Sequence, residues 1–400
     1  MALTIAMASP TRTRADDSGP TKTPDDGRIL IAAFGAVCDG EHDDAAAIQA
    51  ALDAAAAQGG AQVVVPNREC RVGEPLVAGT ATTVVGAGRR SKLSATSTME
   101  VLVTFRVAKD AGYFGGMSDV HLDCRKQARY AVRVDSWRSA RFEAMEINNC
   151  PGAGFHVTSN ESDDSAHHVF DQVWVRDDIS SVPVGTRFAL LEAGRTGKVT
   201  DSVFRDCVIS ATTAFAGAPV YGWELRDTSR IRLEGCRISS VMRWDASVAM
   251  TQTPDPPAGA VARDASSGWN IVRDFYHEQQ RARGAIGVLI DGARAKRGQF
   301  NRDNVVDNIN MQPSDATAVH VTNSGARGNA LHNRVWLPQR ATVAPGTVVV
   351  DPGAAQTVVW VTGGEREVSV GAQEKAAVRD RGSSTQVGGP GWPASSPVPK

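Results

Sequence analysis

The spacing of hydrophobic residues predicts one helix near the N-terminus, followed by a long series of strands. Apolar residues recur three and four positions apart after Asp43 and Asp44, which stand where an N-cap and an acidic first turn belong. Gly59 and Gly60 end this helix. Because isolated helices this short are marginal in water, the apolar stripe must cover something. We expect it to close the open end of a β structure; its residues are Ala47, Ile48, Ala51, Leu52 and Ala55.

Two families of short strands alternate along the rest of the chain. The first family occupies residues 130–135, 154–158, 188–192, 222–227, 287–291, 318–322 and 347–351. The second occupies residues 142–147, 170–175, 204–209, 233–238, 272–277 and 332–337. The families repeat at intervals of about 23 to 40 residues, and no coil buries its apolar face alone, so the pattern predicts a solenoid. Residues 240–267, which include a Pro-rich run, are predicted to form a surface loop.

The repeat also sorts residues by direction, because side chains alternate faces along a strand. Inward positions of the first family hold apolar residues such as Val132, Val134, Phe155 and Val157. Its outward positions hold Arg133, His156, Leu190, Glu224, Leu289, His320 and Val349. The second family places Asp171, Trp174, Arg273 and Tyr276 outward. Three cysteines at or next to its inward positions are interpreted as free, buried thiols, namely Cys150, Cys207 and Cys236.

The helical segment carries a specific resemblance. The strings Phe34-Gly35-Ala36, Asp39-Gly40, Asp43-Asp44 and Ala47-Ile48-Gln49 resemble the entry segment of the pectate-lyase-like superfamily. The resemblance is specific over residues 29–85 and implies an all-β, single-stranded, right-handed parallel β-helix with a short N-terminal capping helix. It does not imply one activity, since the superfamily includes pectate lyases, polygalacturonases, glycan epimerases, fructotransferases and phage tailspikes.

Two cysteines depart from the superfamily pattern. Cys38 stands where the superfamily usually has Gly, and Cys70 stands where an aromatic residue usually follows the turn. Both flank the predicted helix and the strand after it. A disulfide between them would clamp the N-terminal cap of an exported protein, whereas the alternative is two unrelated thiols.

The length and net charge of the chain limit the kinds of partner that it can bind, and its two ends are predicted to differ from the central domain. The 400 residues are 42% hydrophobic, and no stretch reaches the about 18 apolar residues of a membrane span. A formal net charge of −1 argues against nucleic acid. Residues 1–28 are predicted to be a disordered tail or a signal remnant, 29–363 the β-helix domain and 364–400 a disordered tail. The run Ala6-Met7-Ala8 resembles a signal cleavage site, which favours a secreted or extracellular protein.

One candidate site lies on the outward face of the first strand family. Arg133, His156, Glu224 and His320 bring a cation, imidazoles and a carboxylate to one face. A lyase that removes the proton next to a uronate needs a base, such as His, and an Arg that holds the acid group and stabilises the enolate. The alternative is a solvated sheet face whose polar residues have no catalytic role.

Two other groups are candidates. Asp163, Asp164, His167 and Asp171 form an acidic, His-containing stretch in which neighbouring carboxylates would raise one another's pKa, as a general acid requires. The aromatic rings of Trp174 and Tyr276 would hold sugars, and Arg273 is a further substrate-binding candidate. Glu278 ends an aromatic strand as another candidate acid. For the acidic stretch, the alternative is a polar turn without a catalytic role. For Glu278, it is a strand that simply ends in a charged residue.

These residues favour a carbohydrate-active enzyme that cleaves or rearranges the glycosidic bonds of a polysaccharide, either a polysaccharide lyase or a glycoside hydrolase. One alternative is a non-catalytic glycan-binding protein like a virion tailspike, for which a homotrimer is expected; another is an intramolecular glycosyl transferase. The signatures of polygalacturonases and calcium-dependent lyases are absent from the sequence. A Ca²⁺ ion bridging protein and substrate is left open, and the metal is unknown.

Overall fold

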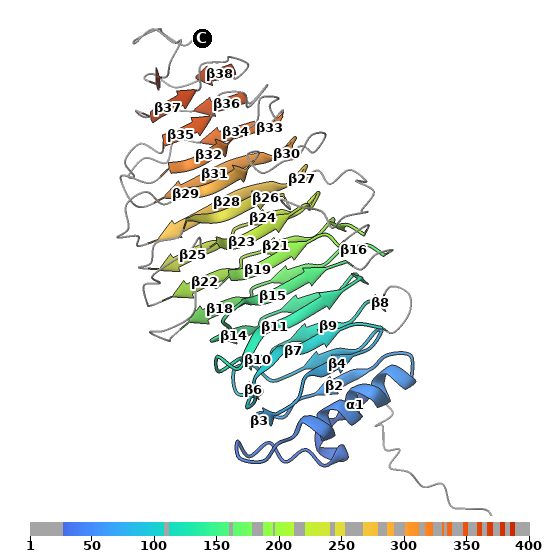
Figure 1. The fold of residues 1–400 in the computed structure, drawn as a ribbon. Coiled ribbons are helices and arrows are strands. Elements are labelled where there is room, and N and C mark those ends of the chain that lie inside the picture. Colours follow the sequence, from blue (N-terminus) through green and yellow to red (C-terminus); the bar gives the residue numbers. More distant parts are fainter. Residues whose placement is uncertain are drawn as a thin grey trace, which may run out of the picture.

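The computed structural model is an elongated stack of β-coils with a helix at its N-terminal end (Figure 1). It describes residues 27–107, 112–159, 163–177, 187–194, 197–211, 221–240, 245–252, 267–278, 286–291, 301–311, 317–322, 330–331, 334–337, 347–350, 358–361, 366–370, 377–380 and 385–388. The strands pair in parallel with their equivalents in the coils before and after them. The right-handed parallel β-helix predicted from the sequence is confirmed.

One sheet of the described chain contains twelve strands and follows the whole stack. Its strands are β4 (Leu76–Ala78), β7 (Met99–Phe105), β11 (Ala128–Asp135), β15 (Ala153–Thr158), β19 (Arg187–Glu192), β23 (Tyr221–Arg226), β26 (Ala246–Thr251), β29 (Ile286–Asp291), β32 (Thr317–Thr322), β35 (Thr347–Val350), β37 (Arg366–Val370) and β39 (Thr385–Gly388). We call it the long sheet. It contains the first strand family of the sequence.

A second sheet, with twenty strands in the described segments, contains the other family. We call it the bent sheet. Its strands are β1 (Arg28–Leu30), β2 (Gln62–Val64), β3 (Glu69–Val72), β5 (Thr83–Val85), β6 (Lys92–Ala95), β9 (Gly116–Ser118), β10 (His121–Asp123), β13 (Arg141–Glu143), β14 (Glu146–Asn148), β17 (Val169–Asp171), β18 (Trp174–Asp177), β21 (Val203–Arg205), β22 (Val208–Ala211), β24 (Arg232–Glu234), β25 (Arg237–Ser240), β28 (Ile271–Glu278), β31 (Val305–Met311), β34 (Arg334–Leu337), β36 (Val358–Val361) and β38 (Ala377–Asp380).

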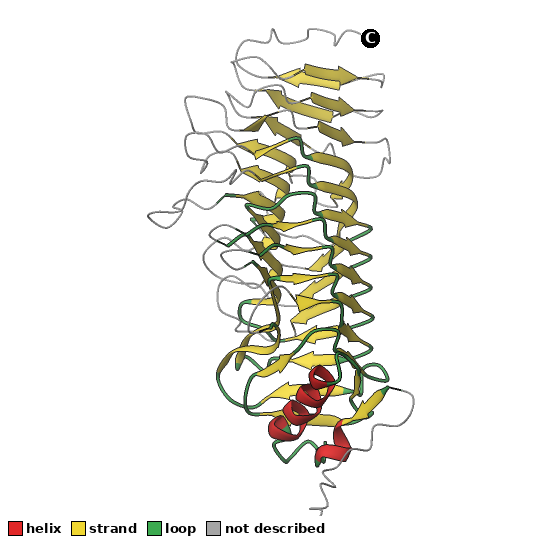
Figure 2. Ribbon diagram, turned by 90° about the vertical axis from the view of Figure 1, so that its right-hand side faces the viewer, coloured by secondary structure: helices red, strands yellow, loops and turns green. Residues whose placement is uncertain are grey.

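A column of two-residue strands completes the coils (Figure 2). It consists of β8 (Gly112–Tyr113), β12 (Trp137–Arg138), β16 (Ser165–Ala166) and β20 (Val199–Thr200), and it continues in β27 (Ser267–Gly268), β30 (Asn301–Arg302) and β33 (Ala330–Leu331). Bridges at Ser229 join the two groups.

The bent sheet corrects one expectation about the strands. Segments such as 142–147 were predicted as single strands, but most of them contain two strands with a bend between. At the bends, Ala144, Gln172, Asp206 and Gly235 have φ angles of 50°, 52°, 49° and 67°. A single residue in this left-handed conformation changes the direction of the chain, so that one strand ends and another begins. Across the bend the buried apolar positions are three residues apart, as in Phe142 and Met145, instead of two, and this interruption of the alternation is the signal of the bend in the sequence.

A second correction concerns residues 240–267, which were predicted to form a loop. Ala246–Thr251 is the strand β26, which pairs with β23 on one side and β29 on the other. All six of its side chains are buried. Small residues hide the usual contrast of apolar and polar positions here, so the segment did not resemble the other coils. Beyond residue 363, where a disordered tail was expected, pairing continues as far as β39.

The core lies between the sheets and contains a stack of aromatic rings. Phe142, Phe170 and Phe204 occupy equivalent positions of three coils, and their ring centroids lie 5.1 and 4.3 Å apart. Phe155 packs edge-on against Phe170 from the long sheet, at 4.8 Å. The inward positions predicted from the repeat are buried, including Val132, Val134 and Val157. Cys207 and Cys236 are free and buried, as expected.

The helix α1 (Ala45–Ala57) covers the first coil with the predicted stripe, of which Ile48, Ala51, Leu52 and Ala55 are buried. Asp43 and Asp44 both precede the helix, and its first turn contains no acidic residue. Asp43 accepts hydrogen bonds from the backbone N–H groups of Ala45 and Gly73. A short 3-10 helix, η1 (Ile31–Phe34), precedes it. Among the described residues, no helix has the length and apolar character needed to cross a membrane.

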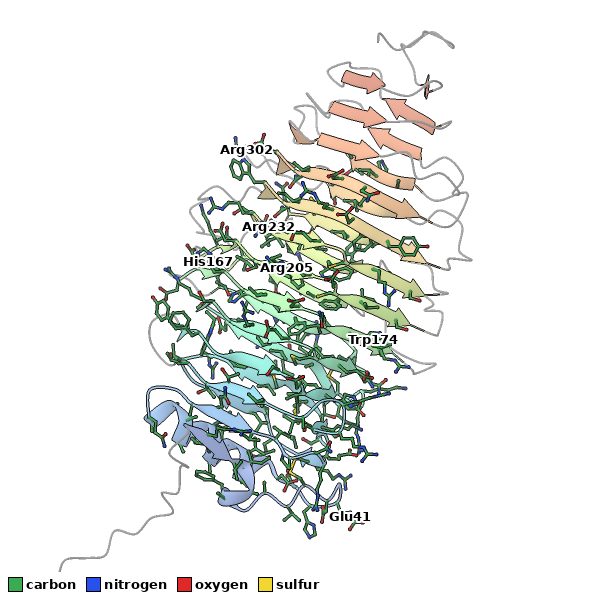
Figure 3. The ribbon with its side chains drawn as sticks, turned by 180° about the vertical axis from the view of Figure 1, so that it is seen from behind. Glu41, His167, Trp174, Arg205, Arg232 and Arg302 are labelled. Carbon is green, nitrogen blue, oxygen red and sulfur yellow. A yellow bond between two sulfur atoms is a disulfide. The ribbon has the colours of Figure 1, made fainter. Side chains whose placement is uncertain are left out.

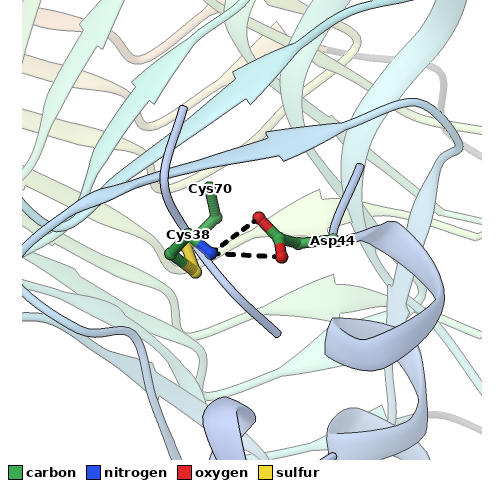
Figure 4. Close-up of side chains that lie close together, drawn as sticks. All are labelled: Cys38, Asp44 and Cys70. Carbon is green, nitrogen blue, oxygen red and sulfur yellow. Dashed lines mark hydrogen bonds between the residues drawn. A yellow bond between two sulfur atoms is a disulfide. The ribbon is translucent and has the colours of Figure 1, made fainter. Parts of the chain in front are cut away.

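A disulfide joins Cys38 to Cys70, as expected, and fixes the segment before α1 to β3. The buried Asp44 carboxylate lies beside it and accepts a hydrogen bond from the Cys38 N–H (Figure 4). These three side chains are the one group with metal-type ligands close together in the described chain, but both sulfurs are already bonded to each other. A second disulfide links Cys124 and Cys150. The interpretation of Cys150 as a free thiol was therefore wrong, because the pairing of neighbouring coils brings Cys124 within bonding distance of it.

Candidate functional site

The outward face of the long sheet carries a row of residues in register. Arg133 on β11 pairs with His156 on β15, which pairs with Leu190 on β19 and then Glu224 on β23. The row arises because each of these residues occupies an outward position of a strand whose neighbouring residues are in the core. Equivalent residues of consecutive coils therefore lie on neighbouring strands, which are about 4.8 Å apart.

His156 lies between a guanidinium group and a carboxylate. Arg133 Nε donates to His156 Nδ1 at 3.2 Å, and His156 Nε2 lies 2.7 Å from Glu192 Oε1. A guanidinium nitrogen only donates, so Nδ1 must be the acceptor and the ring proton must lie on Nε2, facing Glu192. The histidine is 7% exposed. The contacts therefore fix both its tautomer and its orientation.

Glu192 connects His156 to a second arginine. Arg226 Nη1 lies 2.8 Å from Glu192 Oε2, and Arg226 Nη2 lies 2.7 Å from Glu224 Oε1. Burial opposes the positive charge of Arg226, but Glu224 and Glu192 outweigh it and raise the pKa of the guanidinium. Thr251 also donates to Glu224, at 3.2 Å. Alternating charges therefore extend across four coils.

Tyr130 forms an aromatic wall beside His156. The two rings are 4.7 Å apart at an interplanar angle of 31°. The guanidinium carbons of Arg129 and Arg133 lie 5.1 and 5.8 Å from the Tyr130 ring centroid, within the range of cation–π contacts. Both arginines also lie 3.5 Å from Glu100 Oε1. We call Tyr130, Arg133, His156, Glu192 and Arg226 the His156 cluster.

This cluster has the groups that a proton transfer beside a carboxylate needs. His156 is a base whose far nitrogen is held by a carboxylate, an arrangement that stabilises the imidazolium formed when the ring accepts a proton. Arg133 is a cation next to that base, and a guanidinium matches the geometry of a substrate carboxylate. Tyr130 has a hydroxyl group as well as a ring surface.

His320, predicted to belong to the same ladder, lies further along it. Ala249 on β26 and Leu289 on β29 separate it from Glu224 in the row. Of the four residues predicted for this face, the structure joins Arg133 to His156 directly and Glu224 to His156 through Arg226 and Glu192. His320 is on the face but three strands away from Glu224.

The second predicted group is spread over different elements. Asp163 and Asp164 precede β16, and Asp164 accepts a hydrogen bond of 2.8 Å from the Lys198 N–H. Asp171 lies on β17 of the bent sheet, in register with Glu143 and Arg205. Figure 3 shows exposed His167 at one edge of the stack and Trp174 at the other. The structure does not bring His167 and Trp174 together.

The third group lies on β28. Arg273 is exposed, and its Nε lies 3.2 Å from Asp307 Oδ2. Tyr276 is half-buried on the same strand, in register with Arg237. The side chain of Glu278 lies outside the described residues, as does Glu161 before Asp163.

Comparison with known proteins places the chain in a family. A family model described as rhamnogalacturonase A/epimerase, pectate lyase-like, matches residues 30–253, more than half of the chain. The protein belongs to this pectate lyase-like family. The mannuronan C5-epimerases AlgE3 and AlgE5 of Azotobacter vinelandii are 35% and 37% identical to it over 146 residues. These matches cover 30% of this chain but 8% and 14% of the two relatives, so the chain spans a small part of their length.

Two solved structures resemble the pectate lyase-like chain in fold over most of its length. The N-terminal fragment of the bacteriophage Phi29 gene product 12 has a TM-score of 0.53 at 13% identity, over 91% of this chain and 71% of that one. The Streptococcus pneumoniae surface protein and adhesin PfbA has a TM-score of 0.50 at 14% identity, over 90% and 97%. At such low identity these similarities concern the fold alone.

Sequence reasoning missed three members of the His156 cluster in this pectate lyase-like chain. Glu192 and Arg226 occupy the next outward position of the strands that hold Leu190 and Glu224, so the same alternation was available to find them. Tyr130 could not be found in this way. Both Ala131 and Val132 belong to the core, which breaks the alternation and leaves Tyr130 on the outer face.

Proposed function

We propose that the protein modifies an acidic polysaccharide by removing the proton next to a uronate carboxylate. The observation that carries this proposal is the position of His156 between Arg133 and Glu192. The family description and the epimerase relatives agree with a reaction on a polysaccharide. Elimination and epimerisation both begin with this proton, which is why one site serves either outcome.

The first step needs one exchange of partners. Arg133 turns from His156 Nδ1 to the substrate carboxylate, and the freed lone pair of Nδ1 takes the proton from the carbon next to that carboxylate. The electron pair of the broken C–H bond moves into the carboxyl group, and Arg133 stabilises the resulting negative charge. Glu192 keeps the Nε2 proton and stabilises the imidazolium.

The second step decides the product. In elimination, the electron pair returns to form a double bond, the glycosidic C–O bond on the next carbon breaks, and the leaving oxygen takes a proton. In epimerisation, the carbon takes a proton on its opposite face and no bond of the polymer breaks. Tyr130, whose ring lies tilted against that of His156, is the candidate proton donor for either outcome.

We place this reaction outside the cell. Two disulfides, Cys38–Cys70 and Cys124–Cys150, are typical of proteins that fold in an oxidising compartment. Polysaccharides of walls and matrices are encountered there. Export also agrees with the small-residue run near the N-terminus.

Deuterium exchange tests the proposal directly. The protein is incubated in D₂O with polymannuronate, polygalacturonate and a neutral glucan, and the products are analysed by NMR and by the absorbance of unsaturated uronate. We expect deuterium next to the carboxylate, or unsaturated ends, with at least one uronate polymer and none with the glucan. New reducing ends without either signal would indicate hydrolysis and would overturn the proposal.

One observation favours a second candidate, binding without catalysis. Arg133, His156, Glu192 and Arg226 already satisfy one another's charges and hydrogen bonds, so the row is stable without substrate. In that case the face holds an acidic glycan and transforms nothing. Retained binding of uronate polymers with no exchange, no unsaturation and no new reducing ends would support this candidate.

A further inference from the structure

An open pocket lies on the bent sheet near the N-terminal end, away from the His156 cluster. Its volume is about 430 Å³, and its lining residues are Asn67, Arg68, Glu69, Arg89, Arg90, Lys92 and His121. Two stacked turns form it, one between β2 and β3 and one between β5 and β6. The floor comes from the strands themselves, since Glu69, Lys92 and His121 are in register on β3, β6 and β10.

His121 lines this pocket and has one ring nitrogen without a hydrogen-bond partner among the described residues. The residue is 6% exposed, and its Nδ1 lies 3.3 Å from the Arg89 carbonyl oxygen. A carbonyl only accepts, so the proton lies on Nδ1 and the neutral ring presents a lone pair on Nε2. Burial lowers the pKa of His121, which agrees with the neutral form. Nε2 is buried and has no hydrogen-bond partner among the described residues.

Some of the charged side chains around the pocket form ion pairs with described residues, and others do not. Arg89 lies 2.9 Å from Glu146, and Lys92 lies 3.0 Å from Asp123 and 3.5 Å from Glu69. Arg68 and Arg90 have no ion pair with any described residue, although both line the pocket. The pocket therefore offers two uncommitted guanidinium groups beside an imidazole nitrogen that needs a donor.

We propose that this pocket binds an acidic saccharide unit through its carboxylate and a neighbouring hydroxyl group, as a second glycan contact outside the His156 cluster. The carboxylate binds Arg68 and Arg90, for which the fork of a guanidinium is suited. The hydroxyl donates to His121 Nε2 and satisfies it. The inference rests on the proposed class of substrate but not on any catalytic step. Because the cluster lies on the long sheet, a polymer chain can be held here while another segment reacts.

Binding measurements on the full chain test the pocket. The probes are a galacturonate oligomer, a neutral glucan oligomer of equal length, sodium phosphate and a single-stranded oligonucleotide, each titrated calorimetrically at low ionic strength. The test variant is Arg68→Ser with Arg90→Ser. The matched control is Arg232→Ser with Arg237→Ser, which removes two exposed arginines from the bent sheet outside the pocket.

We expect the galacturonate oligomer to bind about tenfold more weakly to the test variant and about equally to the control, since charge-assisted hydrogen bonds are lost only in the former. The imidazole Nε2 resonance of His121 should shift on titration with the oligomer, which a purely structural histidine would not show. Equal losses in both variants, phosphate binding as tight as the oligomer, or binding of the oligonucleotide alone would overturn the proposal.

The same samples separate this inference from the proposed reaction. Loss of binding in Arg68→Ser/Arg90→Ser, together with no deuterium exchange in the unmodified protein, would support the pocket and reject the reaction. Deuterium exchange in the unmodified protein, together with oligomer binding that the two substitutions leave unchanged, would support the reaction and reject the pocket. Short oligomers at saturating concentration should react equally in the test variant and the unmodified protein, because the pocket contributes no reacting group.

Discussion

His156 keeps both ring nitrogens occupied while it is almost fully buried, at 7% exposure. A buried polar group that loses its partner costs about 1 to 3 kcal/mol, so folding alone favours keeping Arg133 and Glu192 beside it. A substrate carboxylate can replace the histidine as the partner of Arg133 without leaving a charge unpaired. In the proposed reaction, the same contacts that stabilise the resting ring also prepare it as a base.

Replacing His156 by Gln should abolish the base. We expect turnover of the uronate polymer to fall by about 10²- to 10⁴-fold, the usual contribution of a positioned base, with binding little changed. Glu192→Gln should lower turnover less, because the imidazolium loses its stabilising charge but the base remains. Turnover and binding are measured for both variants, with the exposed His42→Gln as control. Equal activity of His156→Gln and the control would contradict the role of His156.

His168, next to the candidate residue His167, lies in the interior at a corner of the stack. It is fully buried, accepts a hydrogen bond from the Ala140 N–H at 3.3 Å and lies 2.9 Å from the Ser165 hydroxyl. The backbone N–H of His168 donates to the hydroxyl oxygen of Ser202. These contacts hold together three coils at their corner. Burial lowers the pKa of His168 to about 3.

This pKa predicts a loss of stability in acid. Between pH 6.5 and 3, an unfolded His168 binds a proton that the folded residue does not, so the free energy of unfolding falls as the pH falls. The loss reaches about 5 kcal/mol at the low end of this range. Urea midpoints measured across the range should decrease less steeply in His168→Gln, which starts from a lower value. The same slope in His168→Gln and in the exposed His167→Gln would show that other groups cause the acid loss.

At the scale of elements, the N-terminal cap depends on contacts between segments far apart in the chain. Asp43 links α1 to Gly73, and Asp44 holds the Cys38 segment in place (Figure 4). The helix itself is short and rich in alanine, so its stability comes from the coil that it covers. The disulfide closes the segment of 32 residues that contains the helix.

Removing that disulfide should loosen the cap. For a closed segment of this length, the chain-entropy model assigns about 3 to 4 kcal/mol to the bond. We expect Cys38→Ser with Cys70→Ser to lower the free energy of unfolding by this order, and hydrogen exchange to accelerate most within α1. Exchange in the aromatic coils around Phe170 provides the internal comparison. Uniform acceleration along the whole stack would show that the cap is not a separate unit of stability.

The elements also show how far sequence reasoning reaches. The alternation found the inward and outward rows because it reflects one local rule, and it placed Arg133 beside His156 correctly. It failed where local geometry changes, as at Ala144, whose left-handed bend divides a strand, and at Tyr130, where the alternation breaks. Side-chain partners in neighbouring coils, such as Glu192 for His156 or Cys124 for Cys150, depend on register between distant segments. A single sequence contains no direct record of that register.

At the scale of the molecule, each coil contacts mainly its neighbours, so the stack resembles a one-dimensional array. Interior strands of such an array have partners on both sides. The first coil has a partner on one side, and α1 covers its open end (Figure 2). An uncovered coil would expose a row of unpaired backbone groups, which readily pair with another chain.

A charge in the apolar stripe of α1 should therefore cause association. In Leu52→Asp a carboxylate replaces a side chain that is 1% exposed, and the helix should leave the coil. We expect large species in light scattering and size-exclusion chromatography at concentrations where the unmodified protein shows one peak. Ala46→Asp, on the exposed side of the same helix, is the matched control. Similar association of both variants would contradict the role of the cap.

In consecutive coils in the middle of the stack, the bent sheet turns at the equivalent residues Ala144, Gln172 and Asp206. A gene segment that begins at one bend and ends at the next therefore encodes a complete coil with both of its pairing edges. Duplication or loss of such a segment would lengthen or shorten the stack while leaving its cross-section intact. The length of the molecule can therefore vary independently of the cross-section of its coils, and the outward rows of the long sheet can be extended by whole-coil duplication.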